Sequence, residues 1–324
     1  MRLFAGAVIR GALALGLQLL LVGCAVQPAT DPAAQPPAQA AAGAAVPAPA
    51  PATTQSLIDT NETLVASSGR QVAVRVLRPA VCNACGLIVF SHGANASPGR
   101  YDVLLRAWAT GGWVVAAPLH VDSEEHPERS KYQQSDSLRM RLEDYDLIVA
   151  SQLPGVALSG EVIAAGHSYG ALIAQIAGGA RLDAAFAPIV TRSPLPLAVI
   201  AISPPGPIPN YVTSAGWSKV SVPQLVVSGT TDVVPGMAPE WSLHMASYNA
   251  APAGKAYALV FEAMDHYFNG AYGRLKPTDA AADQAVAKLN AEVLRFAKAI
   301  RDHDPDMAQD WIANSVDGVT ATAR

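Results

Sequence analysis

Short apolar runs alternate with amphipathic stretches from about residue 56 to residue 304. Runs of five or six apolar residues between turn-forming residues are typical of strands buried on both faces, and apolar residues spaced three and four apart are typical of helices. Their alternation predicts an α/β fold, with a mostly parallel central sheet covered by helices on both faces. The predicted strands are 86–91, 113–117, 161–165, 198–202, 224–228 and 257–261, and the predicted helices are 101–110, 136–152, 171–177 and 286–300.

The N-terminal and C-terminal parts of the domain differ from this repeating pattern. Residues 64–66 and 72–77 predict an antiparallel pair, because Val72, Val74 and Val76 alternate with other residues and share one face. No inserted cap domain is expected, since the remaining connections are short. We therefore predict one domain over residues 56–304, followed by a C-terminal tail over residues 305–324.

The N-terminal part has the pattern of an export signal followed by a tether. An apolar stretch too short to span a bilayer follows two arginines and ends in Leu-Val-Gly-Cys, which resembles a bacterial lipobox. We expect residues 1–23 to be a lipoprotein signal peptide and Cys24 to carry the lipid; the alternative is a simple secretory signal. Residues 24–55, rich in Ala and Pro, cannot form a core and predict an extended tether. The protein is expected in the cell envelope, anchored to a membrane by its lipid. In a Gram-negative source this would be the outer membrane, on its periplasmic or surface side.

Charge and cysteine content narrow the possible functions. The net charge of −4 and the lack of a basic stripe argue against nucleic acid as a partner. Besides Cys24, the chain has Cys82 and Cys85, in a C-x-x-C that precedes a strand rather than opening a helix. Export favours a disulfide over a redox or zinc site. No metal site and no cofactor are expected, and the oligomeric state stays open.

The chemistry is predicted by the pentapeptide Gly166-His-Ser168-Tyr-Gly170, a G-x-S-x-G motif. An apolar run that predicts a strand precedes it, and an apolar stretch that predicts a helix follows it. A serine in a sharp strand-to-helix turn has a strained backbone that lifts its hydroxyl clear of the sheet. We therefore interpret Ser168 as a nucleophile rather than as part of a chance pentapeptide.

A serine nucleophile needs a base, and the base needs a carboxylate to orient it. Parallel sheets place such residues at the carboxyl ends of strands. Downstream of Ser168, one predicted strand runs into Asp232 and the next runs into His266. The order Ser168, Asp232, His266 is the order of triad members in α/β-hydrolases.

The alternatives are weaker. Asp232 could only cap a turn, and His266 could be a surface histidine. His303 lies in a polar stretch and His244 within a predicted helix. Asp265 would point away from the base if the backbone is extended there.

The remaining site residues follow from the same geometry. An oxyanion hole needs two N–H donors, and the amides of Tyr169 and of Ala94, in the loop after the strand 86–91, are expected to supply them. His92 and His167 sit in the turns themselves and are expected to pack or hydrogen-bond there. Tyr211 and Trp217 lie in a Pro- and Gly-rich segment after a strand end and are the candidates for the substrate pocket.

The block from Val89 to Asp122, together with Gly-His-Ser-Tyr-Gly, resembles the dienelactone-hydrolase-like branch of the α/β-hydrolase superfamily. Platelet-activating-factor acetylhydrolases, chlorophyllases and bacterial polyester hydrolases are similar to it. The resemblance covers roughly Gln71 to Ile300 and implies ester hydrolysis through an acyl-serine. Dienelactone hydrolase itself uses cysteine where this chain has Ser168. In acetylhydrolases and chlorophyllases the acid follows the sixth strand, but here no acid follows residue 202, so Asp232 takes the role, as in polyester hydrolases.

These features predict a serine carboxylic-ester hydrolase for small or extended acyl esters. A lipid-directed hydrolase and an acyltransferase at the cell envelope use the same acyl-serine and stay open as alternatives. The third alternative is a non-catalytic surface lipoprotein with a hydrolase fold.

Overall fold

The computed structural model describes residues 56–274, 276–313 and 318–324. The predicted signal peptide, Cys24 and the tether therefore lie outside the described residues. The described chain forms a nine-stranded sheet in the order β1-β2-β4-β3-β5-β6-β7-β8-β9. The strands are β1 (Leu57–Val65), β2 (Gln71–Pro79), β3 (Asn83–Ser91), β4 (Val114–Pro118), β5 (Ala157–His167), β6 (Ala198–Ile202), β7 (Gln224–Gly229), β8 (Ala256–Phe261) and β9 (Val319–Ala323).

The six central strands, from β4 to β8 across the sheet, are parallel. At one side, β1 and β2 form the predicted antiparallel pair, with β2 antiparallel to β4. Their register brings the carboxyl ends of the parallel strands together: Ser91 pairs with Gly166, His167 with Ile202, and Gly229 with Phe261. After β3 the chain adds β4 on one side of that strand and then β5 on its other side, and such a switch point is where open α/β sheets form their sites.

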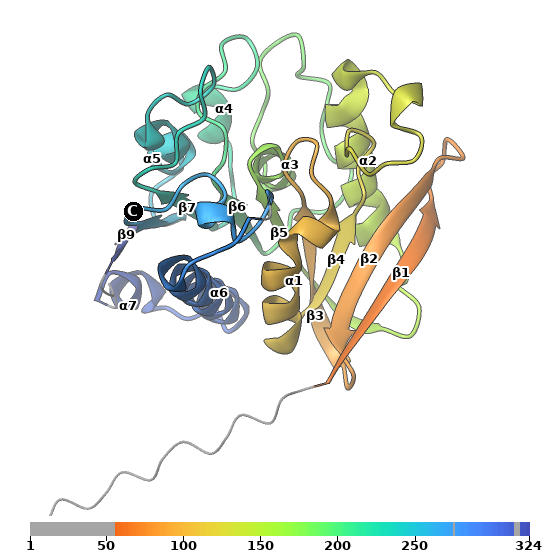
Figure 1. Ribbon diagram of the computed structural model, residues 1–324, viewed down its shortest axis with the longest axis horizontal. Coiled ribbons are helices and arrows are strands. Elements are labelled where there is room, and N and C mark those ends of the chain that lie inside the picture. Colours follow the sequence, from red (N-terminus) through yellow and green to blue (C-terminus); the bar gives the residue numbers. More distant parts are fainter. Residues whose placement is uncertain (1–55, 275, 314–317) are drawn as a thin grey trace, which may run out of the picture. The chain divides into compact units, whose positions relative to one another are not determined.

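Helices cover both faces of the sheet (Figure 1). Alternate strand residues point to opposite faces, so Ile88 and Phe90 join the core on one face while Leu87 and Val89 join the core on the other. The first face packs against α1, α6 and α7, and the second against α2, α3, α4 and α5. The helices are α1 (Asp102–Thr110), α2 (Ser137–Ala150), α3 (Tyr169–Ala177), α4 (Ser214–Trp217), α5 (Ala246–Ala250), α6 (Ala280–Arg301) and α7 (Met307–Ala313). Short 3₁₀ turns, η1 to η5, lie at Pro98–Tyr101, Arg129–Lys131, Gln134–Asp136, Trp241–Met245 and Phe268–Gly270.

The sequence pattern located every central strand, and the structure corrects it at the C-terminus. Residues 305–324, predicted as a tail, contain α7 and the edge strand β9 instead. Trp311 of α7 is fully buried in the core beside α6, and its indole N–H donates to the carbonyl of Ala258. β9 pairs antiparallel with β8, so the domain extends through this segment.

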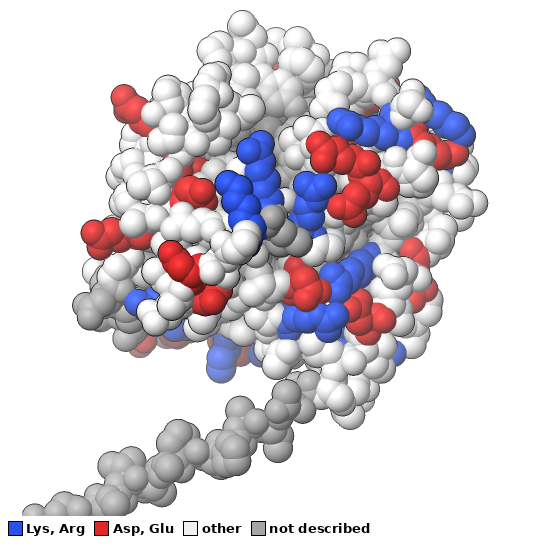
Figure 2. Space-filling view, in the orientation of Figure 1, with Lys and Arg blue, Asp and Glu red and all other residues white. Residues whose placement is uncertain are grey.

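Acidic and basic side chains are intermixed on the face shown in Figure 2. One such cluster joins Asp59 and Asp102 to Arg75 and Arg106 at N–O distances of 2.6–2.9 Å. Among the described residues, no helix combines the length and apolar character needed to cross a membrane. The described chain also shows no folded insertion between its strands beyond the helices and turns given above.

Candidate active site

Ser168 occupies a sharp turn between β5 and α3. Its φ of 55° and ψ of −119° are strained for a residue with a side chain, as a nucleophile turn requires. The turn needs both flanking glycines: a Cβ on Gly166 would lie 2.3 Å from the carbonyl of Gly170, and a Cβ on Gly170 would lie 1.9 Å from the carbonyl oxygen of Ser91. Ser168 itself is only partly buried, so its hydroxyl is accessible.

Asp232 and His266 come from the loops after β7 and β8, which pack against each other. The Nδ1–H of His266 donates to Oδ1 of Asp232 at 2.7 Å, and the hydroxyl of Ser228 donates to Oδ2 at 3.0 Å. Asp232 is fully buried, and burial alone would raise the pKa of its carboxyl; the adjacent rings of His244 and His266 outweigh this and hold that pKa well below its usual range. An ionised Asp232 fixes the tautomer of His266 that leaves Nε2 free to accept a proton.

Asp265, the neighbouring carboxylate, has a different task. Its Oδ1 accepts the backbone N–H groups of Tyr267 at 2.9 Å and Asn269 at 2.7 Å, which closes the turn after His266. The structure therefore places Asp232, and not Asp265, on Nδ1 of His266.

A buried chain of hydrogen bonds connects the loops of this site. The N–H of Gly93 donates to the hydroxyl of Tyr101 at 3.0 Å, and that hydroxyl donates to Nδ1 of His167 at 2.8 Å. The opposite nitrogen of His167 donates to the backbone carbonyl of His266 at 2.8 Å. Burial, and then the nearby His266, lower the pKa of His167 to about 3, so this ring stays neutral and structural. No hydrogen bond joins Ser168 to His266 in the described chain; in unliganded sites such bonds are often long.

The loop after β3 lies beside the serine, because a Cβ on Gly93 would be 3.6 Å from Cβ of Ser168. The Gly93 carbonyl accepts from Nδ1 of His92 at 2.8 Å and from the guanidinium of Arg141 at 3.1 Å. A trans peptide points the next N–H the opposite way, so these two donors direct the Ala94 amide away from Arg141. Ala94 is exposed and its amide has no partner among the described residues, as is true of the Tyr169 amide that opens α3.

Arg141 is fully buried on α2 and holds this loop through several bonds. Its guanidinium donates to both oxygens of Asp122 at 2.8 Å, and to the carbonyl of His92 at 2.5 Å. Burial alone would raise the pKa of Asp122. The charge and the hydrogen bonds of Arg141 together outweigh burial and hold that pKa below its usual range, so the carboxylate is ionised. Sequence reasoning missed Arg141; the available signal was a charged residue between Leu138 and Tyr145 on the apolar face of the helix.

A second serine–histidine–aspartate array lies beneath the loop. The hydroxyl of Ser91 bonds Nε2 of His120 at 2.8 Å, and Nδ1 of His120 bonds Asp144 at 2.7 Å. All three residues are buried, and burial keeps the pKa of His120 far below its usual value. Because substrate cannot reach it, this array supports the strand end rather than forming a catalytic triad.

Asp232, His244 and His266 place their ligand atoms within 4.8 Å of one another, the spacing that a metal ion needs. The ligand atoms of Asp232 and His266 already bond to each other, however, and the His244 ring is held through its other nitrogen. Asp232 accepts from His266 and Ser228, and Nδ1 of His244 donates to the carbonyl of Pro204 at 2.6 Å. We therefore interpret the cluster as a hydrogen-bonded array. His244, which sequence reasoning treated only as a weak alternative base, is the residue that the fold adds to it.

The two pocket candidates differ in position. Tyr211 is half-buried, packs against Phe186 with ring centroids 4.7 Å apart, and contacts the hydroxyl of Tyr169. Trp217 is fully buried, and its indole N–H donates to Gln175 at 3.0 Å. The expectation that Trp217 lines the pocket was therefore wrong. Trp217 is the last residue of α4, and its ring points inward and packs in the core.

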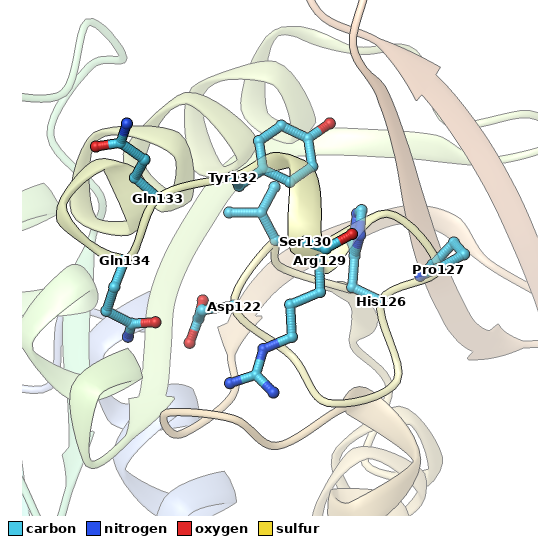
Figure 3. A pocket seen from close by; sticks show the side chains of 9 residues that line it. Asp122, His126, Pro127, Arg129, Ser130, Tyr132, Gln133 and Gln134 are labelled. Carbon is cyan, nitrogen blue, oxygen red and sulfur yellow. The ribbon is translucent and has the colours of Figure 1, made fainter.

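A polar cavity of about 530 Å³ adjoins the loop after β3. The side-chain oxygen of Asn95 accepts from Arg129 at 2.7 Å, and the backbone N–H of Asn95 donates to Asp122 at 3.3 Å, which links the loop to the cavity wall. Figure 3 shows Arg129 and Asp122 on one side of the cavity and the ring of Tyr132 at the other. A larger cavity of about 850 Å³ is lined by the first residues of β5, roughly 30 Å along that strand from Ser168.

Cys82 and Cys85 form a disulfide at the start of β3, with Cα atoms 5.6 Å apart. The bridge lies at the opposite end of β3 from Gly93. It is a local link and takes no part in the arrangement around Ser168.

No family model matches the chain, and no curated protein matches it in sequence. Solved structures do resemble it. A candidate dienelactone hydrolase from Klebsiella pneumoniae has a TM-score of 0.54 at 15% identity, covering 73% of this chain and 98% of that one. A Pyrobaculum calidifontis esterase has a TM-score of 0.52 at 15% identity, covering 74% and 85%. Thermogutta terrifontis esterase 2, phosphoramylated by tabun, has a TM-score of 0.52 at 16% identity, covering 74% and 94%. The likeness establishes the α/β-hydrolase fold.

Proposed function

We propose that this protein is a serine hydrolase that cleaves carboxylic esters through an acyl-serine. One observation carries the proposal: an accessible serine in a strained strand-to-helix turn shares the carboxyl edge of one sheet with a hydrogen-bonded Asp232–His266 pair. The esterases and candidate dienelactone hydrolase of similar fold support the same reaction class.

In the proposed reaction, Nε2 of His266 takes the proton of the Ser168 hydroxyl as its oxygen attacks the ester carbonyl. The amides of Ala94 and Tyr169 stabilise the oxyanion, and Asp232 stabilises the imidazolium that forms. His266 then gives the proton to the leaving alcohol, and water releases the acyl group by the same steps in reverse order.

We infer that the polar cavity next to Asn95 receives part of the substrate. Its lining of Asp122, Arg129, Gln134 and neighbouring polar residues favours small esters with polar groups over long alkyl chains. Graded p-nitrophenyl esters should therefore show faster turnover for short acyl chains. A preference for long chains would favour the lipid-directed alternative, and ester products in the presence of an added alcohol would favour acyl transfer.

Labelling by a fluorophosphonate tests the mechanism. Ser168→Ala should remove both labelling and esterase activity, with a loss of turnover on the order of a millionfold. The exposed Ser214, replaced by alanine, is the matched control and should change neither. Labelling that persists in Ser168→Ala places the nucleophile elsewhere, and a folded wild-type protein that hydrolyses no ester favours the non-catalytic alternative.

We further propose, from the sequence alone, that the protein is exported and held in the cell envelope by a lipid on Cys24. Cys24→Ser should release an active protein from the membrane fraction. A variant that stays membrane-bound contradicts the lipid anchor and leaves the chemistry untouched.

A further inference from the structure

The carboxylate of Asp232 has two histidine neighbours, and the proposed reaction uses only one of them. His266 donates to Oδ1 from one side at 2.7 Å. From the other side, Nε2 of His244 lies 3.0 Å from the same oxygen, at ion-pair distance though outside hydrogen-bond alignment. The rings of His244 and His266 are 5.5 Å apart between centroids.

The opposite side of the His244 ring determines its protonation. A carbonyl oxygen can only accept, so the 2.6 Å bond to Pro204 requires a proton on Nδ1 of His244. A neutral ring would then turn the lone pair of Nε2 toward the Asp232 carboxylate, which is repulsive. A second proton removes that repulsion and makes His244 a cation.

The surroundings agree with a cationic ring. His244 is almost fully buried, and burial lowers its pKa, but Asp232 at 3.0 Å outweighs burial and raises that pKa above the ordinary value. The titratable groups that face it are Asp232, His266 and, beyond His266, the neutral ring of His167. Asp232 is the one anion among these three.

We propose that His244 is a positioning residue that, as a cation, shares the Asp232 carboxylate with His266 and so sets the pH above which His266 is free to act as a base. The inference rests on the proposed function. The positive charge of His244 lies beside the His266 ring, 5.5 Å away between centroids, and opposes a second positive charge there.

The pH dependence of kcat/KM for an ester substrate tests this role. His244→Gln keeps a neutral N–H donor near the position of Nε2 but removes the charge. Two charges 5.5 Å apart, at an effective dielectric constant of about 20, shift a proton equilibrium by about two pH units. The acid limb of the profile should move upward by that amount, with the alkaline plateau nearly unchanged. His303→Gln, a change at an exposed histidine, is the matched control and should leave the profile in place.

A residue that only supported the fold would lower the plateau without moving the limb, and an unshifted limb in folded His244→Gln overturns the proposal. NMR titration of the imidazole signals in the wild-type chain gives a second readout that needs no variant and no activity. His244 should keep its second proton well above pH 6.5, and loss of that proton at or below pH 6.5 also overturns the proposal. If Ser168→Ala keeps full activity, the proposed function fails instead, whatever the titration shows.

Discussion

Arg141 connects the stability of the domain to the geometry of its proposed oxyanion hole, and one substitution can separate the two. Arg141→Met keeps the length and apolar stem of the side chain but removes the guanidinium. It leaves Asp122 buried without its partner, which typically costs about 3–5 kcal/mol of unfolding free energy. For a domain of this size the midpoint of thermal unfolding should fall by roughly 10 °C.

Turnover should fall for a separate reason. The guanidinium bonds the carbonyls of His92 and Gly93 at 2.5 and 3.1 Å and thereby orients the Ala94 amide. Loss of one oxyanion donor lowers turnover by about 10²- to 10³-fold. Asp122→Asn removes the negative charge but leaves Arg141 on both carbonyls, so it should lower turnover much less.

The double variant Arg141→Met/Asp122→Asn distinguishes the two effects. Removing both partners avoids the buried unpaired charge, so most of the lost stability should return. Turnover should stay low, because the guanidinium no longer holds the carbonyls of His92 and Gly93. Thermal melts and kcat on a short p-nitrophenyl ester, measured for all four proteins, complete the cycle. Recovery of wild-type turnover together with stability would refute the role of Arg141 in orienting the loop.

Three further outcomes follow from the site. Asp232→Asn should lower turnover by about ten-thousandfold by favouring the wrong histidine tautomer; Asp265→Asn should be mild, and the reverse pattern in variants of equal thermal stability would reassign the acid. Gly170→Ala should lose several kcal/mol in urea unfolding, because the new Cβ would lie 1.9 Å from the Ser91 carbonyl oxygen; unchanged stability would contradict the close packing of the turn. The pKa of His167 is lowered to about 3 in the folded state. Between pH 6.5 and pH 3, therefore, only the unfolded chain binds a proton at this ring. The free energy of unfolding should fall as the pH falls through this range, by up to about 5 kcal/mol. His167→Gln should flatten that part of the pH–stability curve, and an equally steep curve would assign the effect to other groups.

The central sheet and the candidate triad could be predicted from the sequence because each leaves a local signal. Buried parallel strands are continuous apolar runs, and the order of the strands places residues after their ends at one edge. Ser168, Asp232 and His266 each lie within five residues of the end of such a run. The bounds of β6 agree with the pattern to the residue, and those of β7 and β8 to within one residue at one end.

Other features depend on contacts distant in sequence and left little or no local signal. β9 consists of Val, Thr and Ala, with too little hydrophobic contrast to be read as a strand, and it forms because β8 offers a free edge. His244 contacts Asp232 only because the turn Trp241–Met245 packs against the end of β7. The Pro- and Gly-rich segment that holds Tyr211 and Trp217 predicted a loop at this position. It did not predict which of the two side chains would be buried.

The edge position of β9 has a consequence for how the protein behaves when this strand detaches from the sheet. Without this strand, β8 would present its N–H and C=O groups as a template for a strand of another molecule. β8 leads directly into the loop that holds His266. In that loop, the N–H of Glu262 donates to the carbonyl of Gly318, just before β9. Damage to the last strand would therefore be seen first as aggregation, and any loss of the proposed activity would follow from the insolubility of the protein rather than from a change in Ser168, Asp232 or His266.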